Sequence, residues 1–211
     1  MIKNQDSFDD LKKVDSGMHF VVLDGLDGCG KDTQARNVAR YFAKKKQKVL
    51  IRSHPAEDNY FGRNARKYLR ATGTKAHLLA AIFYAIDVLR SLLYYYRPSH
   101  ARIIFVRYLM GTAYLPGILM RPLYSIFAAI LPTVSCSILI DIRPSIARQR
   151  ILQRGEVEEM FESEPRLVRM RERMYFLART NGWIIVDGNQ SPMKTWTQIE
   201  GQLRNLNSNC T

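Results

Sequence analysis

The sequence contains little cysteine, and this scarcity excludes two classes of protein. Its 211 residues include three cysteines, Cys29, Cys136 and Cys210, which form no CxxC pair and lie far apart. Disulfide-stabilised secreted domains and zinc sites with paired cysteines both need closely spaced cysteines. We therefore expect a reducing environment and a cytoplasmic location.

Long uninterrupted apolar stretches are also missing. The two most apolar segments, 78–96 and 114–132, contain charged residues and prolines such as Asp87 and Pro122, whereas a membrane-spanning helix needs ~20 consecutive apolar residues. We expect both segments to be buried helices. Residues 1–17 lack the apolar core of a signal peptide, so we expect a polar N-terminal tail, no export and no membrane.

Acidic residues are scarce relative to basic ones. The chain has 19 Asp and Glu residues against 32 Lys and Arg residues, which gives a formal net charge of +13. Such an excess favours polyanionic partners, which include phosphorylated small molecules, nucleic acid and anionic membrane surfaces. Charge alone does not choose among these partners.

Length and pattern indicate one soluble α/β domain over residues 18–211. A chain of 211 residues with 46% hydrophobic residues is long enough for one sizeable core and short for two. Short apolar runs alternate with longer helical stretches, which is typical of βαβ units around a parallel sheet. The expected strands are 19–24, 48–53, 102–108, 135–142 and 183–187, and the clearest expected helices are 33–46, 143–154 and 166–179.

A phosphate-binding motif follows the first expected strand. Gly25, Gly30 and Lys31 stand at the spacing of a Walker A loop, and a helical pattern begins directly after them. Backbone amides of such a loop point at phosphate oxygens, and Lys31 is expected to reach the β- and γ-phosphates. The residues predicted to bind ATP are Gly25, Leu26, Asp27, Gly28, Cys29, Gly30, Lys31, Asp32 and Thr33.

The residue after Lys31 departs from the motif. P-loops usually carry Ser or Thr there, whose hydroxyl binds Mg²⁺, whereas this chain has Asp32 followed by Thr33. A carboxylate is a hard oxygen ligand, so Asp32 is one candidate for binding magnesium and Thr33 is the other. Asp32 could instead serve only as a favourable charge at the helix N-terminus. Mg²⁺ is the expected cofactor, with ATP as the phosphoryl donor.

The longer string Leu23–Gln34, LDGLDGCGKDTQ, resembles the loop of thymidylate kinases, whose pattern is close to EGxDGxGKxTQ. Residues 140–155 resemble the family's strand-to-lid segment, LDVxPExAxxRxxxRG, and residues 169–178 resemble its RVR…LA helix. The resemblance continues through 186–192 and covers the chain from about residue 19 onward. It implies a P-loop NTPase fold with a five-stranded parallel sheet flanked by helices and a lid at about 148–166.

The resemblance also implies which residues bind the acceptor. Asp27 would hydrogen-bond the acceptor's sugar, and Arg107 would clamp its phosphate, because Val106-Arg107-Tyr108 stands where the family has DRY. Arg66 aligns with the family arginine that reaches the same phosphate, and Tyr114 aligns with the end of its SSxAY segment. The position of Arg107 after a buried strand independently favours a site residue, since ligands bind at that edge of a parallel sheet.

The same resemblance implies where the catalytic charge comes from. Gly28 stands where some members of the family carry arginine, so the lid arginines Arg150 and Arg154 are expected to act with Lys31 and Arg107 in catalysis. Their spacing would also suit a solvated helix face.

Two positions depart from the family pattern. The family reads its base through an ADR segment and an aromatic residue, but residues 85–88 here read AIDV, which leaves Arg90, Phe83 and Tyr84 as candidates for that role. Val106 replaces a family carboxylate that helps organise magnesium, and Asp32 is a candidate to compensate for it.

The expected reaction is ATP-dependent phosphoryl transfer to a nucleoside monophosphate, with dTMP to dTDP as the expected case. The expected partners are ATP, that nucleotide and a second copy of the chain in a homodimer, while nucleic acid is not expected. The altered positions keep two alternatives open: a P-loop protein that binds nucleotide as a regulator or binds nucleic acid, and a kinase for another phosphorylated metabolite.

Overall fold

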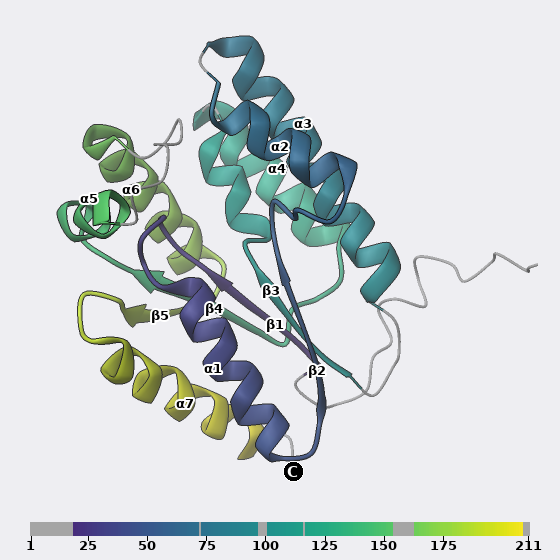
Figure 1. Ribbon diagram of the computed structural model, residues 1–211, viewed down its shortest axis with the longest axis vertical. Coiled ribbons are helices and arrows are strands. Elements are labelled where there is room, and N and C mark those ends of the chain that lie inside the picture. The colour runs from purple at the N-terminus through teal and green to yellow at the C-terminus, as the bar shows by residue number, and fades with distance from the viewer. Residues whose placement is uncertain (1–18, 72, 97–100, 116, 154–162, 209–211) are drawn as a thin grey trace, which may run out of the picture.

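A single parallel sheet organises the molecule (Figure 1). The computed structural model describes residues 19–71, 73–96, 101–115, 117–153 and 163–208. Five strands pair in the order β2-β3-β1-β4-β5, and every pairing is parallel. The strands are β1 (Phe20–Asp24), β2 (Lys48–Ser53), β3 (Ala101–Val106), β4 (Cys136–Asp141) and β5 (Ile184–Asp187). The predicted five-stranded parallel sheet is therefore confirmed.

Helices cover the sheet and extend beyond the carboxyl ends of its strands. In Figure 1, α1 and α7 lie side by side at the bottom, α2, α3 and α4 gather at the top, and α5 and α6 lie to the left. The helical elements are α1 (Lys31–Lys44), α2 (Tyr60–Leu69), α3 (Thr74–Tyr95), the 3₁₀ helix η2 (Leu109–Tyr114), α4 (Gly117–Ile130), α5 (Pro144–Gln153), α6 (Glu164–Thr180) and α7 (Pro192–Ser208). The predicted tail at 1–17 and part of the predicted lid, 154–162, lie outside the described residues.

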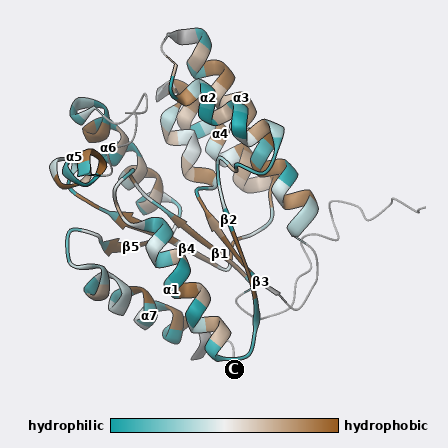
Figure 2. Cartoon of the chain, viewed as in Figure 1, coloured by the Kyte–Doolittle hydropathy of each residue, from teal (hydrophilic) through white to brown (hydrophobic). Residues whose placement is uncertain are grey.

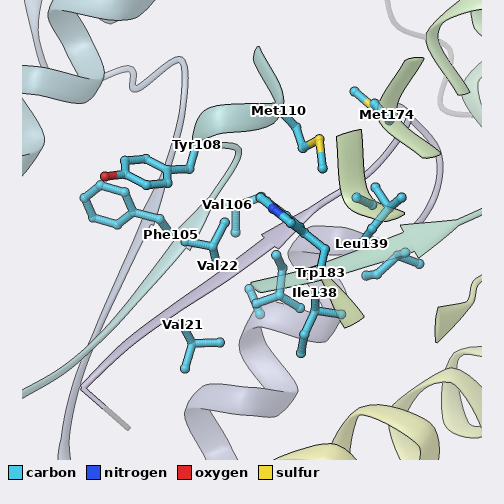
Figure 3. Close-up of a cluster of buried hydrophobic side chains, with 14 of the residues drawn as sticks. Val21, Val22, Phe105, Val106, Tyr108, Met110, Ile138, Leu139, Met174 and Trp183 are labelled. Atoms are coloured by element: carbon cyan, nitrogen blue, oxygen red, sulfur yellow. The ribbon is translucent and has the colours of Figure 1, made fainter. Parts of the chain in front are cut away.

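The core lies where the central strands are covered on both faces. All of β1 is buried, and Phe20 packs edge to face against Phe105 with ring centroids 5.0 Å apart. Side chains from the strands meet Met174 and Trp183 in the same cluster (Figure 3), and the strands are correspondingly apolar in Figure 2. Burial on both faces explains why these strands read as continuous apolar runs, and each large side chain stabilises the fold by roughly 1.5–3 kcal/mol.

Helix α1 begins directly at the glycine loop. Its buried face includes Ala35, Val38 and Phe42, at the spacing that the sequence pattern predicts. The helix starts at Lys31, two residues before the predicted start, because Gly30 ends the loop in a left-handed conformation with a φ of 91°. Lys31 therefore lies in the first turn, where the helix dipole also favours anions.

Helix α4 is less buried than predicted, because only Met120 and Tyr124 of it are buried. Helix α3 also differs from its prediction as a buried helix. By length and composition its segment Lys75–Tyr95 could cross a membrane, and only 33% of its most apolar window is buried. One side packs against α2, whereas Leu78, Ile82, Leu89 and Leu93 are 62%, 45%, 37% and 58% exposed. The apolar character of this segment therefore does not come from core packing alone.

Candidate active site

A cavity of about 900 Å³ opens above the carboxyl ends of β1, β2 and β3. Loops after these strands form one side of it, and residues of α2, α3, η2 and α6 form the others. Its charged lining residues are Asp24, Asp27, Asp32, Arg66, Arg107, Arg166, Arg169 and Arg173. Ligands of open parallel sheets bind at this edge, so the cavity is the candidate active site.

The glycine loop reaches its shape through close backbone contacts. A Cβ atom on Gly25 would lie 2.5 Å from the carbonyl oxygen of Ile140, and one on Gly28 would lie 2.6 Å from that of Ala147. Gly28 also has a φ of 82°, a conformation that favours glycine. The contact with α5 therefore leaves no room for a side chain at Gly28.

The loop presents unused hydrogen-bond donors. Within the described part of the chain, the amide groups of Gly28 and Gly30 donate to no protein acceptor. They stand at the N-terminus of α1, where the helix dipole adds positive character. This arrangement suits the phosphates of a nucleotide.

Three charged side chains meet at the base of the cavity. The ammonium group of Lys31, which is 2% exposed, donates to Asp27 Oδ1 over 2.9 Å and to the carbonyl of Leu26 over 3.1 Å. The guanidinium of Arg107 donates to the same carboxylate oxygen. Burial alone would raise the pKa of Asp27, but the charges of Arg107 and Lys31 hold that pKa well below its usual range. Asp27 is therefore ionised and binds both cations.

Arg107 adopts a backbone conformation that is rare for a residue with a side chain. Its φ is 65°, and left-handed conformations cost about 1–2 kcal/mol outside glycine. The surroundings enforce this conformation, because its amide donates to Leu23 over 3.0 Å and its guanidinium donates to the carbonyl of His54 over 3.1 Å. His54 is fully buried, and burial lowers its pKa to about 4, so a neutral ring supports the arginine.

Asp24 is a site residue that sequence reasoning missed. Its carboxylate accepts hydrogen bonds from the amides of Gly25 over 2.9 Å and Tyr108 over 3.0 Å, which join the glycine loop to the end of β3. Burial raises the pKa of this carboxyl group. A carboxylate at the end of an otherwise apolar buried strand was the available signal.

The four predicted acceptor-binding residues line this one cavity. Asp27 and Arg107 contribute from the loops, Arg66 from α2 and Tyr114 from the end of η2. Arg66 donates to the carbonyl of Pro55 over 3.3 Å and pairs with a glutamate carboxylate. Burial raises the pKa of the Tyr114 phenol well above its ordinary value, so Tyr114 presents a neutral hydroxyl. The structure thus brings these residues together, and their roles remain predictions.

Arg150 lies on the other side of the glycine loop. Its guanidinium donates to the carbonyls of Gly28 and Gly188 over 3.3 Å each and to that of Gln190 over 3.5 Å. These contacts tie the loop to the segment between β5 and α7, and Arg150 is not among the cavity-lining side chains of the described residues. Arg154, the other predicted lid arginine, lies outside the described residues.

The two magnesium candidates differ in position. Asp32 lines the cavity and accepts a hydrogen bond from the Ser53 hydroxyl over 3.1 Å. Thr33 is exposed and accepts from Arg36 over 3.4 Å. No group of three or more His, Cys, Asp or Glu side chains among the described residues could hold a metal by itself. The residues present therefore fit an ion held mainly by nucleotide phosphates and water, as magnesium often is, with Asp32 as a carboxylate that lines the cavity.

The three candidates for recognising the base, Phe83, Tyr84 and Arg90, lie in different surroundings. Tyr84 lines the cavity, whereas Phe83 stacks on Tyr68 with ring centroids 5.7 Å apart. Arg90 lies over the ring of Tyr94, 4.7 Å from its centroid, and is not part of the described cavity lining. Tyr84 is therefore the one of these three that a ligand in the cavity would meet.

The segment that replaces the family's ADR has a structural function. The buried carboxylate of Asp87 accepts from the Ala56 amide and from Asn59 Nδ2, both over 2.7 Å. Asn59 in turn caps α2. Val88 is a core residue, so this part of α3 holds α2 in place and offers no polar group to a base.

The wall formed by α6 was the other feature that sequence reasoning missed. Arg166, Arg169 and Arg173 all line the cavity. Arg173 donates to the carbonyls of Ala113 and Leu115 over 3.1 and 2.8 Å. The available signal was their spacing, since residues three and seven positions apart share one face of a helix.

Comparisons with known proteins agree with this architecture. The family model described as thymidylate kinase matches residues 23–199. A "Probable thymidylate kinase" of Metallosphaera sedula is 26% identical over 187 residues, which cover 88% of this chain and 92% of that protein. The "Thymidylate kinase" of Carboxydothermus hydrogenoformans is 25% identical over 201 residues, which cover 89% and 98%. Because the family match spans most of the chain and the described fold and glycine loop agree with it, this chain belongs to the thymidylate kinase family.

Proposed function

We propose that this protein transfers the γ-phosphoryl group of ATP to a nucleoside monophosphate, with dTMP to dTDP as the preferred reaction. The observation that carries the proposal is the cluster of Lys31, Asp27 and Arg107 where the glycine loop meets the cavity. Asp27 and Arg107 line the cavity, and Lys31 contacts Asp27. In this proposal Lys31 would serve the donor phosphate and Arg107 the acceptor phosphate. The names of the full-length relatives support thymidylate as the acceptor.

Charge stabilisation and alignment account for the chemistry. In phosphoryl transfer the charge spreads over the equatorial oxygens, so cations that align donor and acceptor provide most of the catalysis. The amides of Gly28 and Gly30 would hold the donor phosphates, and Arg107 would hold two acceptor oxygens with its planar fork. The acceptor oxygen belongs to an ionised phosphate, so the reaction needs no general base.

Magnesium is part of this proposal. When bound, the ion neutralises charge on the donor phosphates. Asp32 would hold it directly or through water, positioned by its hydrogen bond with Ser53. An Asp32→Ser variant that keeps the full rate and the same magnesium requirement would contradict this assignment.

A homodimer is also proposed. The exposed residues Leu78, Ile82, Leu89 and Leu93 follow one another at intervals of four, seven and four along α3, which places them on one face of the helix. Leu78, at one end of this face, also lines the cavity. A second copy presents the same uncharged stripe, so the two can pair about a two-fold axis. We define these four residues as the α3 stripe.

The remaining proposals concern organisation and location. All described strands belong to one sheet, which supports a single kinase domain over residues 18–211. The two cysteines within the described residues, Cys29 and Cys136, are free, which suits a reducing cytoplasm.

Turnover with a panel of acceptors tests the function. Purified protein is incubated with Mg-ATP and dTMP, dUMP, UMP, CMP, AMP or GMP, and ADP formation is followed. We expect the highest kcat/KM with dTMP. ADP formation no faster than without acceptor would reject the kinase, and Mg-ATP uptake without turnover would favour a nucleotide-binding regulator.

A further inference from the structure

Most cations around the cavity are already engaged by the protein. Lys31 and Arg107 share the carboxylate of Asp27, and Arg66 pairs with Glu57. A phosphoryl group in transfer carries several negative charges, and a cation with no competing anion stabilises them most strongly. Such a cation must therefore come from elsewhere in the cavity lining.

Arg169 meets this requirement. It lines the cavity that Asp27, Asp32 and Arg107 also line. It is exposed, and it makes no hydrogen bond or ion pair with any part of the chain that the structure describes.

Helix α6 holds Arg169 on a fixed wall. On another face of the helix, Arg171 donates two hydrogen bonds of 2.7 Å each to the carboxylate of Asp141 at the end of β4. Leu167 and Met170 are buried on either side of Arg169. Because the backbone is anchored in this way, the guanidinium can extend into the cavity without movement of the helix.

Arg150 has the opposite properties. Its three carbonyl partners hold the glycine loop against the segment after β5. Withdrawing it toward the cavity would leave these carbonyls without their donor.

We propose that Arg169 is a catalytic residue that contacts a phosphoryl oxygen in the transition state, while Arg150 positions the glycine loop. This inference rests on the proposed function, because it names a further group for the same phosphoryl transfer.

Two substitutions at Arg169 and one matched control test the inference. Arg169→Ala is expected to lower kcat by about 100- to 1000-fold, the loss seen when one transition-state donor is removed. Arg169→Lys is expected to recover part of that loss, because it keeps the charge and loses the planar fork. The control is Arg179→Ala on the same helix, where the guanidinium lies 6.0 Å from the centroid of the Tyr175 ring, and we expect its kcat within about twofold of the parent, as for surface substitutions away from a site.

The outcomes separate the inference from the proposed function. A parent enzyme that phosphorylates an acceptor, together with a folded Arg169→Ala variant of equal kcat, would overturn the inference alone. If the parent phosphorylates none, the readout becomes the affinity for adenosine and thymidine joined by five phosphates, measured by calorimetry. A loss of about tenfold or more in Arg169→Ala, near 1.4 kcal/mol, would support the contact, and an unchanged affinity would reject it.

Discussion

The floor of the cavity and its walls are held in different ways. The floor consists of the glycine loop and Arg107. Its charged side chains bind one another directly, since Lys31 and Arg107 both pair with Asp27. The walls are the cavity-facing sides of α3 and α6, which are separated by more than 60 residues of sequence. The floor is thus fixed by contacts between the ends of neighbouring strands, whereas the walls depend on how helices pack over the sheet.

This difference predicts that the floor tolerates substitution least. Lys31→Ala should lower turnover by at least about 1000-fold, because the variant loses the buried ammonium group that we propose contacts the donor phosphates. Cooperative unfolding in urea should persist. The matched control is Lys44→Ala in the exposed last turn of α1, and turnover of Lys31→Ala equal to this control would contradict the assignment of the loop.

Arg107→Ala is expected to have the next largest effect. The loss should be about 2–4 kcal/mol of transition-state stabilisation, or roughly 30- to 1000-fold in kcat/KM for the acceptor. Arg66→Ala should lose less, because this arginine already pairs with the exposed Glu57. Steady-state kinetics with varied acceptor would check the order, and an unchanged kcat/KM in Arg107→Ala would remove its role as clamp.

Substitutions at two glycines of the floor distinguish the cost of a positive φ from the cost of a steric clash with α5. Gly28→Ala and Gly30→Ala both place a side chain at positive φ, but only the first brings a Cβ within 2.6 Å of the backbone of α5, while the second meets nothing within 4 Å. Gly28→Ala should therefore unfold with a free energy about 1–3 kcal/mol lower than Gly30→Ala. Urea denaturation measures the free energy of unfolding of both variants. Equal values would show that α5 moves to accommodate the added Cβ atom.

The smallest effect on turnover is expected on the outer side of the α3 wall. Leu93→Glu places a charge in the α3 stripe and should shift the protein from dimer to monomer, with turnover changed only a few-fold. Ile118→Glu on α4, where Ile118 is 84% exposed, serves as the control and should stay dimeric. Light scattering at several protein concentrations measures the molecular mass of both variants and of the parent. A parent protein that is already monomeric would reject the dimer.

The features that sequence predicts well are those encoded within a few residues. The strands are recognisable because burial on both faces demands continuous apolar runs, and the glycine loop because phosphate binding demands a fixed local spacing. The location of Arg107 was also predictable from sequence, because a residue that follows a buried strand lies at the ligand-binding edge of the sheet.

The features that sequence does not predict arise from packing between distant segments. Asp87 appeared as part of an incomplete base-reading segment, but its partners Ala56 and Asn59 lie about 30 residues earlier in the chain. Arg150 appeared as a catalytic arginine, and the structure shows its contacts with carbonyls from two other loops. No local pattern specifies such partners, so the α6 wall and the exposed side of α3 emerged only with the fold.

The sharing of Asp27 also has a consequence for the order of events during turnover. Two cations held this close would repel one another in an empty site, and the carboxylate serves as their internal counterion. An arriving phosphate adds a second anion beside these cations and so competes with the carboxylate for their charge. The first nucleotide to bind therefore changes the electrostatic environment that the second one meets.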